Sequence, residues 1–174
     1  MRVLIDYFGE IPVSQAIQIG VTRENAAWAE QERRIFLKQS LETKLIQLYY
    51  EAGQYRDALP LIASLLRELK RLDDKMILTE VHLLESKVNH AISNFAKAKA
   101  ALTSARAAAN SIYCPPAMQA QLDMQSGILH AEDKDYNTAL VLANRLIILL
   151  RNARGLFVDG RCSCATCAEV HAPV

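Results

Sequence analysis

The chain has 174 residues, of which 51% are apolar, and it carries 20 basic and 19 acidic side chains. This length is enough for a sizeable core, and the apolar content argues against a disordered chain. A formal net charge of +1 gives no electrostatic reason to expect a nucleic-acid partner. No apolar run approaches the roughly 18 residues of a membrane-spanning helix, so we expect no membrane contact.

The helical period dominates the chain from its first third onward. Residues 14–34, with the run AAWA from Ala26, predict an early helix. Further on, apolar residues recur three and four positions apart, as in the series Leu61, Leu65 and Leu69. Glycine and proline are scarce, at 6 and 5, and the alternation typical of strands is absent. The sequence therefore predicts an all-α fold.

Three segments align with one another at a fixed spacing. They are GQYRDALPLIASLLREL from Gly53, SNFAKAKAALTSARAAA from Ser93 and KDYNTALVLANRLIILL from Lys134. Each contains an aromatic residue and an alanine three positions later, at spacings of 40 and 41: Tyr55 and Ala58, Phe95 and Ala98, Tyr136 and Ala139. Each unit is predicted to be a helix, a short polar turn and a second helix that opens with the aromatic.

These six residues are predicted to pack at the repeat junctions. The aromatic would fill the wedge between paired helices, and the alanine would let the two backbones approach. We expect Tyr55, Phe95, Ala58 and Ala98 to be buried. A fixed period of helix pairs is typical of an α-solenoid. The period exceeds the roughly 34 residues of a tetratricopeptide repeat, but the pattern is tetratricopeptide-like, and we expect a right-handed superhelix.

Two histidines, His90 and His130, also lie 40 residues apart, with Tyr50 a further 40 upstream. They are expected at equivalent places in successive units, as stacked polar groups at the edge of the repeats. A ladder of metal ligands is the alternative interpretation, but neighbouring helices pack about 8–10 Å apart, which makes the reach marginal.

Several long strings between about Phe36 and Ala139 closely resemble a known family. They are LLRELKRLDDK from Leu65, VHLLESKVNHAISN from Val81, KAKAALTSARAAANSIYCPP from Lys97 and LDMQSGILHA from Leu122. The chain resembles the 26S proteasome lid-subunit family called non-ATPase regulatory subunit 11, with a weaker match back to Arg2. The resemblance implies a tetratricopeptide-like solenoid, followed in the family by a winged-helix PCI module.

The resemblance also implies a function. It suggests a structural subunit of the regulatory particle lid, which helps to clamp the base and core particle together in ubiquitin-dependent degradation. Its partners would be other lid, base and core subunits, in the cytoplasm and nucleus. The resemblance brings no catalytic residues, no cofactor and no small-molecule substrate. The alternative is an unrelated helical-repeat adaptor that binds peptide tails, but its basic carboxylate clamp is not visible, because Lys44, Arg67 and Lys87 do not repeat in register.

The resemblance stops after Ala139, which divides the chain. Residues 1–139 are expected to form the helical-repeat region. Residues 140–152 are expected to form a divergent helix, with some leucine surface left exposed, and residues 153–174 an irregular tail. The PCI module of the family has no counterpart in these 174 residues, so we expect an incomplete form.

Four metal-ligand types lie together near the end of the chain. Cys162, Cys164, Cys167 and His171 have the spacing CxCxxCxxxH, and three thiols with an imidazole suit tetrahedral zinc. The spacing lacks the second paired half of common structural zinc sites. It also lies where the family resemblance has ended. We therefore expect no bound metal and a mobile tail, with zinc binding as the alternative.

Overall fold

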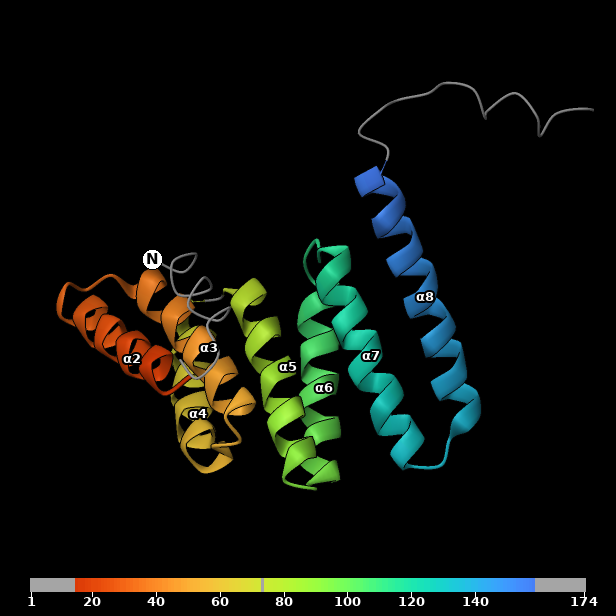
Figure 1. Cartoon of the computed structure of the whole chain (residues 1–174), viewed down its shortest axis with the longest axis horizontal. Coiled ribbons are helices and arrows are strands. Elements are labelled where there is room, and N and C mark those ends of the chain that lie inside the picture. The colour runs from red at the N-terminus through yellow and green to blue at the C-terminus, as the bar shows by residue number, and fades with distance from the viewer. Residues whose placement is uncertain (1–14, 73, 159–174) are drawn as a thin grey trace, which may run out of the picture.

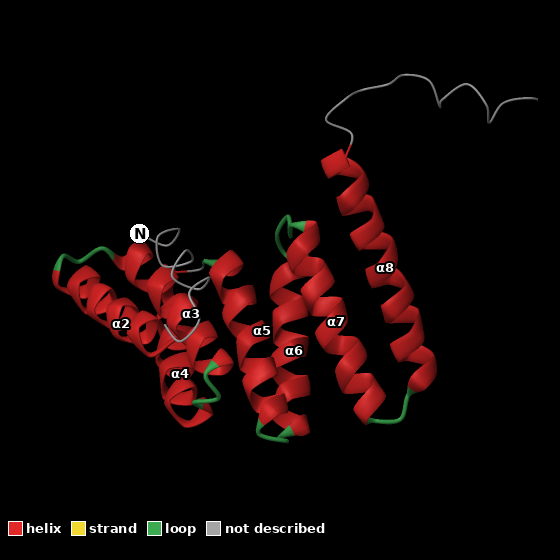
Figure 2. Ribbon diagram, in the orientation of Figure 1, coloured by secondary structure: helices red, strands yellow, loops and turns green. Residues whose placement is uncertain are grey.

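The structure is a computed structural model that describes residues 15–72 and 74–158. These residues form helices and connecting turns, and no strand occurs among them (Figure 2). The helices are α2 (Gln15–Gln31), α3 (Ile35–Glu51), α4 (Tyr55–Leu72), α5 (Lys75–Ala91), α6 (Phe95–Asn110), α7 (Pro116–Glu132) and α8 (Tyr136–Val158). The predicted all-α fold is confirmed.

The helices follow one another along the long axis of the molecule, from α2 at one end to α8 at the other (Figure 1). Three pairs, α3–α4, α5–α6 and α7–α8, correspond to the three predicted units. The second helix of each pair begins at the predicted aromatic residue: Tyr55, Phe95 or Tyr136. This succession of helix pairs is the arrangement of an α-solenoid. The right-handed twist remains a prediction.

The turns that end α2, α3, α5 and α7 share one geometry. Each contains a residue with positive φ, at Arg33 (53°), Gly53 (72°), Ser93 (66°) and Lys134 (66°). The next residue donates its backbone N–H to a carbonyl five positions earlier, as in Gln54 to Tyr49 at 2.9 Å and Asp135 to His130 at 3.0 Å. This pattern caps the last carbonyls of the helix and reverses the chain. The repeated turn thus gives each helix pair the same tight hairpin.

These turns correct the expected equivalence of His90 and His130. The turn hydrogen bond accepted by His130 is accepted in the previous unit by Asn89 and in the first unit by Tyr49, so His90 is one position out of register. The cause is a change of period. Helix α6 has 16 residues where α4 has 18, but the connection that follows α6 is three residues longer, so the second interval contains one more residue than the first.

The core consists of successive clusters rather than one centre. The first joins α2 and α3 through Ala26, Ala29 and Leu41. The second, which we call the leucine cluster, joins α3, α4 and α5; it contains Leu45, Ile46, Tyr49, Ala58, Ile62, Leu65, Leu66, Leu69, Val81, Leu84 and Val88. The third, the alanine cluster, joins α5, α6 and α7; it contains Leu83, Ala98, Leu102, Ala105, Ala109, Leu122 and Leu129. Each helix is therefore stabilised by its neighbours, as in other solenoids.

Helix α8 contains the predicted helix from Leu140 to Arg151 and packs against α7. It continues to Val158, so the expected start of the irregular tail at residue 153 is wrong; no proline interrupts the segment. Leu140, Val141 and Ile147 are largely exposed on it. None of the described helices is both long and apolar enough to cross a membrane. Cys162, Cys164, Cys167 and His171 lie outside the described residues.

Candidate protein-interaction surfaces

Two of the three alanines predicted at the repeat junctions are fully buried. Ala58 and Ala98 have no exposed surface. The carbonyl of Ala98 accepts a hydrogen bond of 2.9 Å from the hydroxyl of Ser86 on α5. A side chain longer than a methyl group at Ala98 would therefore push α6 away from α5. Ala139, the third member, is only half-buried against α7.

The predicted aromatic wedges are less buried than expected. Tyr55 is partly buried, with its ring centroid 6.1 Å from that of Tyr50. Phe95 is 38% exposed and Tyr136 is 65% exposed, so the expected burial of Phe95 is wrong. Each aromatic is the first residue of its helix, beside the turn, where the neighbouring helices cover one side of the ring only. Phe95 makes an edge contact with His90, with the centroids 5.9 Å apart.

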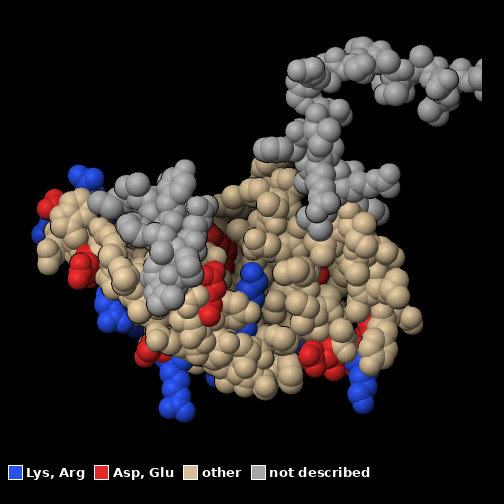
Figure 3. Space-filling view, viewed as in Figure 1, with Lys and Arg blue, Asp and Glu red and all other residues tan. Residues whose placement is uncertain are grey.

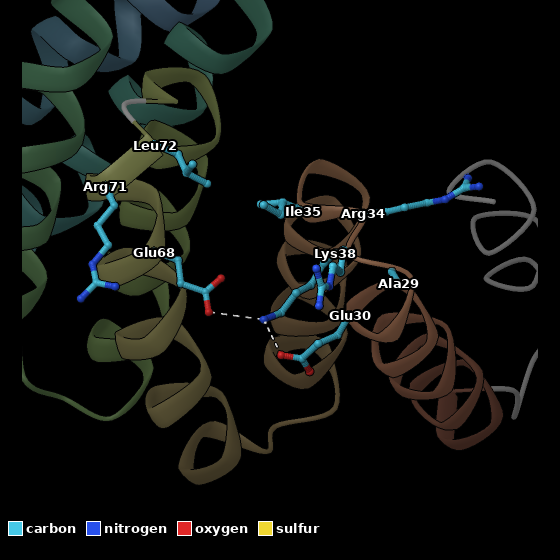
Figure 4. Close-up of a pocket in the computed structure, with 9 residues that line it drawn as sticks. Ala29, Glu30, Arg34, Ile35, Lys38, Glu68, Arg71 and Leu72 are labelled. Atoms are coloured by element: carbon cyan, nitrogen blue, oxygen red, sulfur yellow. Dashed lines mark hydrogen bonds and ion pairs between the residues drawn. The ribbon is translucent and has the colours of Figure 1, made fainter.

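A partly buried charge network joins α2, α3 and α4 (Figure 4). The Lys38 ammonium lies 3.1 Å from Glu30 Oε1 and 3.3 Å from Glu68 Oε1, and 3.8 Å from Glu42 Oε1 one turn further along α3. Burial lowers the pKa of Lys38, but the three carboxylates outweigh that effect and raise it overall. Burial raises the pKa of Glu42 to about 7, against the lowering effect of Lys38. The network ties α2 and α4 to α3 through Lys38.

Three residues of this network, Glu30, Lys38 and Glu68, also line a pocket of about 390 Å³ between the α2–α3 turn and the end of α4. Figure 4 shows Lys38 reaching across it from α3 toward Glu68 on α4, with Ile35 and Leu72 facing each other above. Beyond Lys38, the cations Arg33, Arg34 and Arg71 lie at its margin. The guanidinium of Arg34 lies over the ring of Trp28, 5.5 Å from its centroid.

An adjoining hollow of about 600 Å³ continues along the same edge of the solenoid. It shares Leu72 with the pocket and is lined by residues from the ends of α3, α4, α5 and α6: Phe36, Leu72, Asp74, Lys75, Met76, Ile112 and Tyr113. Phe36 is 69% exposed and Tyr113 is 89% exposed. Large apolar groups gathered at one exposed hollow are typical of a protein-binding surface. We call the residues that line this hollow, together with Ile35 of the adjoining pocket, the apolar edge.

Figure 3 shows scattered charges of both signs between uncharged areas of the visible face, with no expanse of a single sign. One charge group is buried at the other end of the solenoid. The carboxylate of Asp123 on α7, 2% exposed, lies between Arg106 of α6 at 3.6 Å and Arg145 of α8 at 3.3 Å. The latter ion pair connects α8 to α7, and the former connects α6 to α7. Sequence reasoning missed Lys38 and Asp123, because each meets partners more than 15 residues away as well as local ones, and no spacing rule indicates such contacts.

Among residues 15–72 and 74–158 the structure describes one cysteine, Cys114. Cys114 is a free thiol whose pKa is raised by burial, which disfavours the reactive thiolate. No group of three or more His, Cys, Asp or Glu side chains in the described part of the chain is placed to hold a metal ion.

The described helices define a helical-repeat protein. Residues 1–52 match the family of the 26S proteasome regulatory subunit RPN6 N-terminal domain. The chain is 58% identical over 139 residues to the probable 26S proteasome regulatory subunit rpn6 of Schizosaccharomyces pombe, 55% to the regulatory subunit RPN6 of Saccharomyces cerevisiae and 52% to the non-ATPase regulatory subunit 11 of Dictyostelium discoideum. Over that stretch the chain is related to Rpn6-type proteasome regulatory subunits, and the resemblance found in the sequence is confirmed.

The match covers 80% of this chain but only 33% of the S. pombe relative, 34% of the D. discoideum one and 32% of the S. cerevisiae one. The chain thus spans about a third of the length of the curated relatives it matches. Their names describe regulatory subunits of the proteasome.

Proposed function

We propose that this chain provides helical repeats of a structural subunit in the regulatory particle lid of the 26S proteasome. Identity of 52% to 58% over 139 residues to proteins named as proteasome regulatory subunits carries the proposal. Identity at this level exceeds what the buried core alone accounts for, so part of the surface is shared with these relatives. The unrelated peptide-binding adaptor is not favoured by these relatives.

The proposed role is non-catalytic, with other proteasome subunits as partners in the cytoplasm and nucleus. The apolar edge supports a protein partner, because Phe36 and Tyr113 expose large rings that water solvates poorly. Their positions at the ends of α3 and α6 leave the helix-pair cores intact if they are replaced. Residues at this edge are therefore suited to test assembly separately from folding.

A segment exchange tests the proposal. Residues 1–139 of this chain would replace the matching stretch of S. pombe rpn6, and the lid would be purified through a different, tagged subunit. We expect the chimera to be recovered with the lid in the same proportion as the unexchanged protein. A folded chimera that is absent from the purified lid would contradict the proposal.

Two variants of the chimera sharpen the result. Phe36→Ser and Tyr113→Ser together should reduce recovery with the lid several-fold while leaving the melting temperature of the chimera within a few degrees. Ile17→Ser is the matched control, since Ile17 is a comparably exposed apolar residue on α2 away from the apolar edge. Equal recovery of the double variant would remove the apolar edge from the proposal without affecting the segment exchange.

A further inference from the structure

A second hollow, between α6 and α7, holds polar groups that neither the core nor the apolar edge uses. It has a volume of about 200 Å³. Its polar lining comes from one face of each helix: Lys99, Thr103 and Arg106 on α6, and Ser126, His130 and Asp133 on α7. Leu102 and Leu129 form the apolar part of its wall. We call it the α6–α7 hollow.

Two residues that line this hollow each have a buried polar atom without a hydrogen-bond partner. These atoms are the hydroxyl oxygen of Ser126 and Nδ1 of His130. Ser126 is 1% exposed, and an unpaired buried hydroxyl is costly. The volume of the hollow is many times the roughly 10–15 Å³ that is needed to hold one water. A single bridging water would therefore leave most of the hollow empty, and a larger polar group fits better.

The charges around the hollow favour an anion. Lys99 is paired with Asp133 at one end. At the other end, Asp123 is shared between Arg106 and Arg145. Of the charged residues that line the hollow, Lys99 and Arg106 are cations and Asp133 is an anion, which leaves one net positive charge. The Arg145 contact to Asp123, at 3.3 Å, is the shorter of the two, so Arg106 at 3.6 Å is the less committed cation.

We propose that the α6–α7 hollow is an oxyanion-binding subsite that takes a carboxylate or phosphate group. The hydroxyl of Ser126 and the Nδ1–H of His130 donate hydrogen bonds to the oxyanion from α7. Lys99 and Arg106 supply the charge-assisted donors from α6, which are the stronger ones. The group can be a free anion or belong to an acidic or phosphorylated side chain of a partner. The proposal concerns binding by this chain alone and does not depend on assembly into a lid.

Titration of the full chain with inorganic phosphate and, separately, with sodium acetate tests the subsite, at constant ionic strength maintained with chloride. The readout is the imidazole carbon-bound proton signals of His130 in the NMR spectrum. We expect a saturable shift of the His130 signals with at least one of the two anions. The His90 signals serve as the internal reference, since His90 lies outside the hollow and faces Glu132 at 3.8 Å.

The variants assign the donors. Lys99→Gln and Ser126→Ala should each weaken binding, the former by about tenfold because it removes a charged donor. Lys97→Gln is the matched control, since Lys97 is on the same helix and outside the hollow. The proposal is overturned if neither anion produces a saturable shift in the folded chain, or if Lys97→Gln weakens binding as much as Lys99→Gln.

A phosphoserine peptide and the same peptide with unmodified serine distinguish the sources of the oxyanion. Tighter binding of the phosphopeptide than of inorganic phosphate would assign the subsite to a partner's side chain. Equal affinity would assign it to the free anion. Either result supports the subsite, whereas displacement of bound phosphate by neither peptide nor acetate would restrict it to free phosphate.

Discussion

The α4 and α6 helices occupy equivalent places in successive repeats, yet they are buried by different means. Of the five buried residues of α4, four are leucine or isoleucine and one is alanine; of the five of α6, four are alanine and one is leucine. The leucine cluster fills the space between helices with large side chains, while the alanine cluster closes it by bringing the backbones together. One fold is thus held by two kinds of packing, which should fail in opposite ways.

Placing a charge in the alanine cluster should have the largest effect. Ala98→Arg forces a guanidinium into the contact between α5 and α6, where Ala98 has no exposed surface. An unpaired buried charge and the displaced helix should together lower the free energy of unfolding by about 4 kcal/mol. Urea unfolding followed by circular dichroism measures this. Ala100→Arg is the control, at an exposed position of the same helix, and should change the free energy of unfolding by less than about 0.5 kcal/mol. If Ala98→Arg leaves the free energy of unfolding unchanged, the predicted repeat register is wrong.

The leucine cluster should be most sensitive to a loss of volume. Leu65→Ala removes a fully buried side chain of α4 and should cost about 3 kcal/mol, from lost burial and from the cavity that remains. The same urea measurement applies. Leu59→Ala, on the exposed side of α4, should cost less than about 1 kcal/mol. Similar losses at the two positions would mean that the leucine cluster can collapse around the cavity.

The reverse change, from small to large, sharpens the comparison in the alanine cluster. Ala105 is fully buried on α6, about two helical turns beyond Ala98. Ala105→Leu overfills the contact with α5 and should cost about 2 kcal/mol, although it adds apolar surface. A thermal melt would detect this as a lower Tm. A higher Tm would show that α6 holds unfilled space and that its alanines do not set the helix spacing.

Sequence reasoning reached the fold because the fold follows from local periodicity. The repeat spacing identified where α4, α6 and α8 begin, and the apolar period identified the helices. Exposure was harder to predict. Phe95 and Tyr136 lie in the predicted register but at the first position of their helices, where burial depends on how far the next helix extends over the turn. Repetition in sequence indicates that positions are equivalent, but it does not show how much of each position is covered.

The candidate surfaces could not be predicted for a related reason. The apolar edge is assembled from four helix ends, between Ile35 and Tyr113, and no local pattern unites them. The Lys38 network has one local pair, with Glu42, which the four-residue spacing on α3 could have suggested. Its contact with Glu68 joins residues 30 positions apart. Long-range pairs of this kind appear only when the helices are placed in space.

Glu42 is a largely buried acid on α3, one of the helices joined by the leucine cluster. Burial raises the pKa of Glu42 from 4.5 to about 7, so the folded state binds this proton more tightly than the unfolded state. The stability that this proton provides is fully present below about pH 4.5 and is lost as the pH rises to about 7. Glu42→Gln resembles the protonated acid, so the variant should match the wild type near pH 5 and exceed it at pH 8.

The expected gain at pH 8 is about 1 kcal/mol, because solvent screening around the partly exposed network reduces the full linkage value. Urea unfolding of both proteins at several pH values gives the difference, from which the other titrating groups cancel. Glu85→Gln is the control for a general charge effect. It removes an acid on α5 whose carboxylate lies 3.0 Å from His82 Nδ1. A variant that is less stable than the wild type at pH 8 would show that the Lys38 attraction outweighs the burial of Glu42.

The smallest expected effect concerns the turns, where the two halves differ by one residue type. Gly53 ends α3 in the leucine half and Ser93 ends α5 in the alanine half, at φ values of 72° and 66°. Glycine adopts this conformation without the steric cost that a Cβ brings, which is about 1 kcal/mol. Ser93 is exposed, so its replacement removes no buried contact. Ser93→Gly should therefore stabilise the protein by about 0.5 kcal/mol, since the greater freedom of glycine in the unfolded chain offsets part of the gain.

Gly53→Ser should destabilise the protein by a similar amount, because no atom lies within 4 Å of a Cβ built there and only the backbone strain changes. Calorimetric melts of the two variants test this reciprocity: opposite shifts in Tm of similar size would show that the turns are equivalent, whereas a loss of stability in both would mean that the hydroxyl of Ser93 contributes to its turn.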